Sequence, residues 1–214
     1  MSDEAYQVPR GPGEAAFTER RSRFIGRVCP ACDEDEALAF LQEIRARHWD
    51  ATHNVYAYLL REGSLMRYSD DGEPQGTAGL PVLDVLRRAG VYNLICVVTR
   101  YFGGVLLGTG GLVRAYARAA REALDAAGLA TMRRWTRLTV ACPYPLLVPV
   151  RQEIAAAGGV EESVEYAADV SIALWMPAPL AGAFIGRIVD LSAGRVTPAA
   201  GEEAFRALQT EGSP

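Results

Sequence analysis

A strongly apolar run, residues 91–101, leads into a loop in which five of nine residues, 103–111, are glycine. Such a run is typical of a central strand that is buried on both faces. The pattern after the loop indicates a helix over residues 111–127 that ends at Gly128. A glycine-rich loop between a buried strand and a helix leaves backbone N–H groups free to contact a ligand. These groups lie next to the positive end of the helix dipole. The pattern therefore predicts an α/β fold with an anion site at this junction.

Two arginines add positive charge to the predicted junction. Arg100 lies at the strand exit and Arg114 on the first turns of the helix, so we expect both to flank the same point. Guanidinium groups bind phosphate or carboxylate in bidentate geometry. The alternative interpretation is tight packing of the helix on the strand, with Arg100 as a structural tie. The candidate residues for binding an anion or nucleic acid are Arg100, Gly103, Gly104, Gly108, Thr109, Gly110, Gly111, Arg114 and Tyr116.

A second polar segment, residues 69–79, holds three carboxylates within four positions. One interpretation is a magnesium site, and another is a general acid–base pair. A third is a structural Asp-Gly turn in which Thr77 caps the next helix. A carboxylate of this loop that pairs with Arg100 would make the two segments one site. The residues of this motif are Asp70, Asp71, Gly72, Glu73 and Thr77, together with His53, which is either a packed side chain or a base.

The charge composition excludes several functional classes. All 22 basic residues are arginine, so no Schiff-base, pyridoxal-bearing or phosphate-loop lysine exists. The net charge of −4 argues against general coating of nucleic acid and restricts any polyanion contact to a local patch. No apolar run reaches the ~20 residues of a membrane helix, and residues 1–13 lack the layout of a signal peptide. We expect a cytoplasmic protein without a membrane partner or a cofactor.

Four cysteines, in a chain expected in the cytosol, argue against a disulfide framework. Cys96 and Cys142 lie in apolar runs and are expected in the core. Cys29 and Cys32 form a CxxC pair at a strand–helix junction, where the helix dipole lowers a thiol pKa. A redox motif, half of a zinc site and chance spacing are the alternatives.

The pattern of elements divides the chain near residue 134, into domains 1–134 and 135–214. In the first, strands are expected over residues 16–28, 55–60 and 91–101, with helices after Asp33, around residues 80–86 and over 111–127. In the second, the order strand-helix-strand-strand-helix-strand is that of a ferredoxin-like βαββαβ domain. Its elements are expected over residues 137–142, 145–157, 160–166, 168–176 and 179–191, with a last strand that begins at Arg195.

These motifs resemble the signature of the IMPACT family, and in particular its bacterial YigZ-like branch. The resemblance rests on residues 22–25, His53, residues 69–79 with Pro81, and residues 98–104 and 107–116. It implies a first domain like the second domain of ribosomal protein S5 and a second domain similar to the ferredoxin-like domains of elongation factor G. The CxxC pair is not part of this signature.

The junction and the resemblance together favour a translation-associated binding protein over an enzyme. Its expected partner is RNA, the ribosome or a small molecule that bears a phosphate. One alternative is a metal-dependent hydrolase or phosphotransferase that uses Asp70, Asp71 and Glu73, which requires these carboxylates to converge. Another is a protein-interaction module, which requires an exposed apolar patch and a protein partner. We assign no catalytic residue and no metal ligand.

Overall fold

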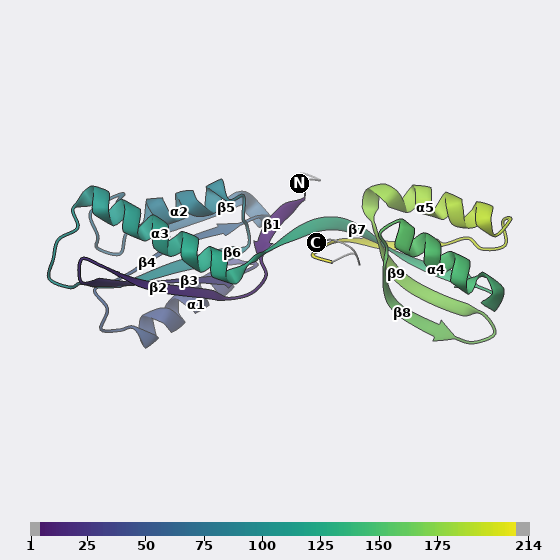
Figure 1. Ribbon diagram of the computed structural model, residues 1–214, viewed down its shortest axis with the longest axis horizontal. Coiled ribbons are helices and arrows are strands. Elements are labelled where there is room, and N and C mark those ends of the chain that lie inside the picture. The colour runs from purple at the N-terminus through teal and green to yellow at the C-terminus, as the bar shows by residue number, and fades with distance from the viewer. Residues whose placement is uncertain (1–4, 209–214) are drawn as a thin grey trace. The chain divides into compact units, whose positions relative to one another are not determined.

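Figure 1 shows a computed structural model of the chain, which describes residues 5–208. The chain forms two compact units, a first unit of Tyr6–Ala130 and a second unit that begins at Thr131. Each unit has its own sheet and its own hydrophobic core. Within residues 5–208, no helix is both long enough and apolar enough to cross a lipid bilayer.

The first unit is built on an antiparallel sheet with the strand order β2-β3-β6-β4-β5. The apolar run forms the central strand, β6, as predicted, and all of its residues except the last are buried. The elements in chain order are β1 (Tyr6–Pro9), β2 (Gly13–Glu19), β3 (Ser22–Pro30), α1 (Glu34–Arg47), β4 (His53–Leu60), η1 (Glu62–Ser64), β5 (Leu65–Ser69), α2 (Gly79–Arg88), β6 (Leu94–Tyr101) and α3 (Thr109–Ala127).

The helices of the first unit lie in two layers, with α2 and α3 on one face of the sheet and α1 on the other (Figure 1). The α3 helix lies very close to β3, because Gly26 has no side chain. A Cβ atom at Gly26 would lie 2.3 Å from the carbonyl oxygen of Ala119. The close contact fixes the position of α3, whose amino end carries the predicted anion site.

The prediction of one strand over residues 16–28 is wrong, because the segment is a hairpin of β2 and β3. The turn consists of Arg20 and Arg21, whose φ angles are 44° and 67°. Tight hairpin turns require this left-handed conformation and usually use glycine or asparagine. Two arginines give no such turn signal in the sequence. By contrast, the predicted cap at Asp33 is confirmed, since its side chain accepts a hydrogen bond from the Glu36 amide at the start of α1.

The second unit has the predicted ferredoxin-like order of elements. Its strands run antiparallel in the order β10-β7-β9-β8, and α4 and α5 contribute to its core (Figure 1). The last strand begins at Ala199, later than the predicted Arg195. The elements are β7 (Leu129–Cys142), η2 (Tyr144–Leu146), α4 (Leu147–Ala156), β8 (Val160–Tyr166), β9 (Val170–Pro177), α5 (Ala178–Leu191) and β10 (Ala199–Arg206).

Candidate anion-binding site

The two motif segments meet in a buried ion pair. Arg100 lies on β6 and is 4% exposed, and its Nη1 atom donates to Glu73 Oε1 at 2.5 Å. Its Nη2 atom lies 3.3 Å from the hydroxyl of Ser22 on β3. A buried ion pair persists only where further hydrogen bonds compensate for the loss of water. The pair joins the loop of residues 69–79 to the central strand, which makes the two segments one site.

Two more side chains surround the Glu73 carboxylate. The buried Tyr116 hydroxyl, from α3, donates to Glu73 Oε1 at 2.7 Å. Burial, together with the adjacent carboxylate, raises the pKa of Tyr116, so this donor keeps its proton. His53 lies beside Arg100 in the sheet, and its Nδ1 is 2.7 Å from the carbonyl oxygen of Asp71. Because a carbonyl only accepts, Nδ1 carries the proton, while Nε2 lies 3.8 Å from Glu73 Oε1.

The other two carboxylates of the loop have structural partners of their own. Asp70 accepts hydrogen bonds from the amides of Gly76, Ala78 and Gly79, at 2.8, 3.1 and 2.8 Å. Asp71 accepts from the amide of Asn54 at 2.7 Å and from Arg45 at 3.0 Å. The carboxylates therefore do not converge, and residues 5–208 contain no cluster of acidic, histidine and cysteine side chains that could hold a metal ion. The geometry does not support the metal-dependent interpretation.

The loop has the conformation of the Asp-Gly turn, but its expected cap is wrong. Asp71 and Gly72 both have positive φ angles, 45° and 86°, which is the turn geometry. The Thr77 hydroxyl donates backwards to the carbonyl of Pro74 at 2.6 Å and does not cap α2. The Asp70 carboxylate accepts instead from the amides of Ala78 and Gly79 at the start of α2, which lie eight and nine residues after it.

Replacement of Asp70 by alanine is expected to lower the free energy of unfolding by about 1–2 kcal/mol, because the amides at the start of α2 lose their acceptor. Asp70→Asn, which keeps an acceptor oxygen, should recover most of this loss. Urea unfolding followed by circular dichroism measures both variants. Equal stability of Asp70→Ala and the unaltered protein would contradict the capping role.

The amino end of α3 has free backbone donors. Gly108 precedes the helix with φ 72° and ψ 165°, and its carbonyl accepts the first helical hydrogen bond, from Leu112, at 2.9 Å. No side chain caps the helix. The amides of Thr109, Gly110 and Gly111 have no acceptor among residues 5–208. These donors and the helix dipole together favour an anion at this end.

A pocket of about 380 Å³ lies beside these amides. It brings Arg100 together with Gly108 and Thr109. The Arg100 guanidinium lies within 6 Å of the ring centres of Phe24 and Phe102, and its buried Nε has no acceptor in the described part of the chain. The pocket is thus lined both by Arg100, whose Nε atom is unpaired within residues 5–208, and by the amino end of α3. Its lining residues are Thr52, His53, Glu73, Pro74, Arg100, Phe102, Leu106, Leu107, Gly108, Thr109 and Leu112.

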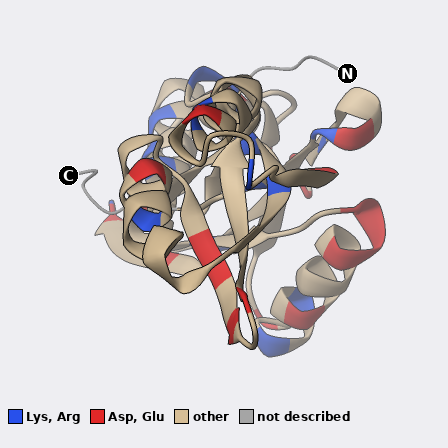
Figure 2. Ribbon diagram, turned by 90° about the vertical axis from the view of Figure 1, so that its right-hand side faces the viewer, with Lys and Arg blue, Asp and Glu red and all other residues tan. Residues whose placement is uncertain are grey.

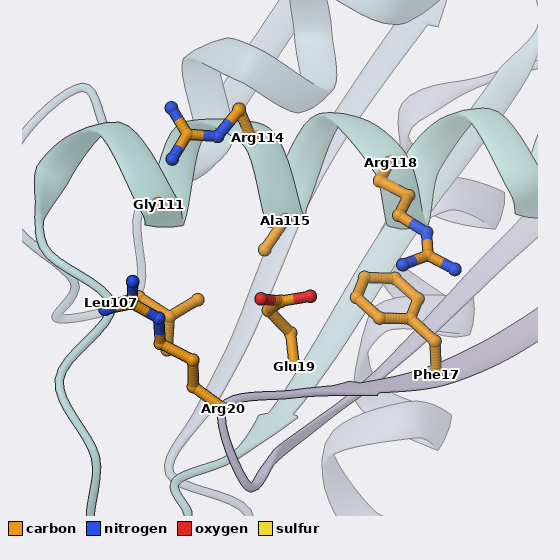
Figure 3. A pocket seen from close by; sticks show the side chains of 8 residues that line it. All are labelled: Phe17, Glu19, Arg20, Leu107, Gly111, Arg114, Ala115 and Arg118. Carbon is orange, nitrogen blue, oxygen red and sulfur yellow. The ribbon is translucent and has the colours of Figure 1, made fainter.

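Arg114 does not line this pocket, which departs from the expectation that it flanks the same point as Arg100. It is exposed and lines a neighbouring pocket of about 260 Å³ between α3 and the β2–β3 turn (Figure 3). Leu107 lines both pockets. A Cβ atom at Gly110 would lie 3.5 Å from Arg114 Nη1, so the guanidinium folds back over the first turn of α3. Arg114 and Arg100 therefore lie on different sides of the same helix end.

The remaining predicted residues shape the loop. A Cβ atom at Gly103 would lie 2.0 Å from the carbonyl oxygen of Arg21, so glycine is required where the loop crosses the hairpin turn. Gly104 has a φ angle of 81°. Tyr116 is fully buried, and the neighbouring Phe102 is 45% exposed at the pocket. The sequence reasoning missed Phe17, Arg20 and Arg118 of the second pocket, although Arg114 and Arg118 have the i, i+4 spacing of one helix face.

The CxxC pair lacks the electrostatics of a reactive thiol. All four cysteines are free, and Cys96 and Cys142 are buried as predicted. Partial burial, with the carboxylates of Glu43 and Glu36, raises the pKa of Cys29. Partial burial, with Glu36 and Asp33, raises the pKa of Cys32. The expectation that the helix dipole lowers the Cys32 pKa is therefore wrong, because acidic residues occupy the first turn of α1.

Comparison with known proteins places this site in a known family. The Impact N-terminal domain profile matches residues 20–124, and a domain of unknown function (DUF1949) matches residues 140–195. The chain is 33% identical to the IMPACT family member YvyE of Bacillus subtilis (strain 168) and 35% identical to YigZ of Escherichia coli (strain K12). These alignments cover 94% of the chain in each case, and 93% and 100% of the two relatives. The chain belongs to the IMPACT family.

A solved structure described as "Crystal structure of an hypothetical protein" is 33% identical to this IMPACT-family chain. The TM-score is 0.59, and the alignment covers 93% of the chain and 98% of that structure. The candidate anion site of the family member described here lies entirely within the matched Impact N-terminal domain.

Proposed function

We propose that this IMPACT-family chain is a translation-associated protein that binds a phosphate group, of RNA or of a nucleotide, at the amino end of α3. The observation that carries the proposal is the set of free amides at Thr109, Gly110 and Gly111, of which Thr109 lines the same pocket as Arg100. Backbone donors at a helix amino end are a common phosphate site in proteins.

The amides supply most of the expected attraction. The charge of Arg100 is largely balanced by Glu73 at 2.5 Å, so the guanidinium adds little net charge to the pocket. The apolar side chains that line the pocket, which include Phe102, Leu107 and Leu112, lower the local dielectric and strengthen hydrogen bonds made beside them. The translation-associated role is motivated by the resemblance of the two units to domains of ribosomal protein S5 and elongation factor G.

Removal of one amide tests the site directly. Proline is tolerated at the first helical position because its ring fits the helical φ angle and the missing N–H has no partner inside the helix. Thr109→Pro is therefore expected to keep α3 and to weaken binding of inorganic phosphate and uridine monophosphate about tenfold, the equivalent of ~1.5 kcal/mol for one charged hydrogen bond. Isothermal titration calorimetry measures the affinity.

Thr109→Ala is the matched control, since it removes the same hydroxyl but keeps the amide, and it should bind like the unaltered protein. Equal affinities for Thr109→Pro and Thr109→Ala would exclude the amide site. The translation-associated half of the proposal is tested separately, by co-sedimentation with ribosomes at about 0.05 and 0.2 M salt. Binding that is absent, or that does not weaken with salt, would refute it.

A further inference from the structure

The outward face of α3 carries a row of arginines. Arg114, Arg118 and Arg121 occupy positions i, i+4 and i+7 and are all exposed, whereas Ala115 and Ala119 of the same helix are buried. Positions with this spacing lie on one side of a helix. At 1.5 Å per residue, the row extends over roughly 10 Å of the helix.

Of the three arginines, Arg118 has an acidic partner among residues 5–208, Glu122 at 2.7 Å. Arg114 and Arg121 make no ion pair with any residue of the described chain, 5–208. In the second unit, by contrast, Arg137, Arg151 and Arg187 each pair with a glutamate at 2.7–2.9 Å. Figure 2 likewise shows basic and acidic segments interspersed on the side that faces the viewer. Because the whole chain has a net charge of −4, this row of arginines is a local region of positive charge on a protein that is acidic overall.

Arg118 is held in a fixed, planar arrangement. Its guanidinium carbon lies 4.0 Å from the ring centre of Phe17, and its Nε donates to Glu122 at 2.7 Å. Phe17 in turn stacks on Phe24, with ring centres 5.3 Å apart and planes 13° from parallel. The three groups form one stack whose outermost layer is a guanidinium plane. Such a plane accepts a nucleobase by stacking and cation–π attraction.

The second pocket lies along this row. Its opposite wall is the β2–β3 turn, from which Arg20 extends toward Leu107 (Figure 3). The Glu19 carboxylate lies between Arg20 and the Arg118–Phe17 pair in the same view. Glu19 forms no ion pair within residues 5–208, so it opposes any anion that enters the pocket. The pocket holds about 260 Å³, which is too small to enclose a duplex.

We propose that this arginine track, defined as Arg20, Arg114, Arg118 and Arg121, binds a single-stranded nucleic acid. Charges spread over roughly 10 Å suit the repeated phosphates of a strand and exceed what a single phosphate group needs. The inference rests on the proposed function, because the amino end of α3 then receives one phosphate of the same strand. The track extends that contact to neighbouring nucleotides.

The test compares matched charge removals. A short fluorescent oligouridylate is titrated with protein, and anisotropy reports binding. Each phosphate contact to a single strand contributes a salt-dependent slope of about −0.7, so its loss weakens binding about fivefold at ~0.1 M salt. Arg114→Gln/Arg118→Gln is therefore expected to weaken binding at least about fivefold through the lost phosphate contact of Arg114, and further through the lost stacking plane of Arg118, and to reduce the salt slope by about 0.7. Arg47→Gln/Arg67→Gln removes the same charge from α1 and β5 and should bind within about twofold of the unaltered protein.

A variant that binds oligouridylate more tightly cannot be explained by unfolding, because an unfolded protein would bind less tightly. Glu19→Gln removes the opposing carboxylate and should tighten oligouridylate binding several-fold. The proposal is overturned if the Glu19 and Arg114/Arg118 variants bind like the unaltered protein, or if a duplex or a polyglutamate peptide binds as tightly as the single strand. Loss of oligouridylate binding in the arginine variant, with phosphate binding insensitive to Thr109→Pro, would instead refute the amide site and keep the track.

Discussion

Replacement of Arg100 by methionine is expected to lower the free energy of unfolding by about 3–5 kcal/mol, because the change leaves the Glu73 carboxylate buried without its cation. Both side chains are at most 5% exposed, and their atoms meet at 2.5 Å. Water therefore cannot replace the lost guanidinium. Chemical unfolding of the purified variant measures the loss, which should appear as a lower midpoint at an unchanged denaturant slope.

The double variant Arg100→Met/Glu73→Gln separates the ion pair from the general effect of a core change. Glutamine keeps an oxygen that accepts from the Tyr116 hydroxyl, and no unpaired charge remains in the core. The double variant should therefore recover most of the stability that Arg100→Met loses. A loss below about 1 kcal/mol for Arg100→Met, or a double variant less stable than the single one, would show that the pair does not couple the loop to the strand.

The parts of the fold that could be predicted from the sequence depend on local patterns. The apolar run of β6, the cap at Asp33 and the ferredoxin-like order follow from periodicity and from end signals. The strand–loop–helix junction also follows, because an apolar run and an amphipathic pattern mark the strand and the helix on either side of the glycine-rich loop. The expected pairing of a loop carboxylate with Arg100 is found in the structure, and Glu73 provides it.

The features that the sequence did not reveal depend on tertiary contacts. Thr77 has the position of a local helix cap, but Asp70 reaches the same amides across a turn whose path the sequence does not specify. Arg100 and Arg114 line different pockets. Arg100 extends from the buried strand β6, whereas Arg114 lies on the exposed side of α3, between buried positions of the helix. Leu112 and Ala115 of α3 are buried, and Arg114 between them is exposed, as the apolar positions of an amphipathic helix require.

Replacement of Gly26 by valine should destabilise the first unit by about 3 kcal/mol, because its side chain would displace α3 from the sheet. The backbone angles of Gly26 are open to any residue, so the effect comes from space alone. The nearest atoms are the carbonyl oxygen and carbon of Ala119, 2.3 and 2.9 Å from the added Cβ, and neither can rotate away.

Thermal and urea unfolding measure this loss, and Gly186→Ala provides the control. Gly186 lies in α5, where a Cβ atom would meet nothing within 4 Å, so alanine should stabilise the protein by about 0.5–1 kcal/mol through helix propensity. A Gly26→Val protein of normal stability would show that α3 can move outward without loss. Because α3 also carries the free amides and Tyr116, such freedom would separate the Glu73 side chain from the proposed phosphate site, and the two could not act as one unit.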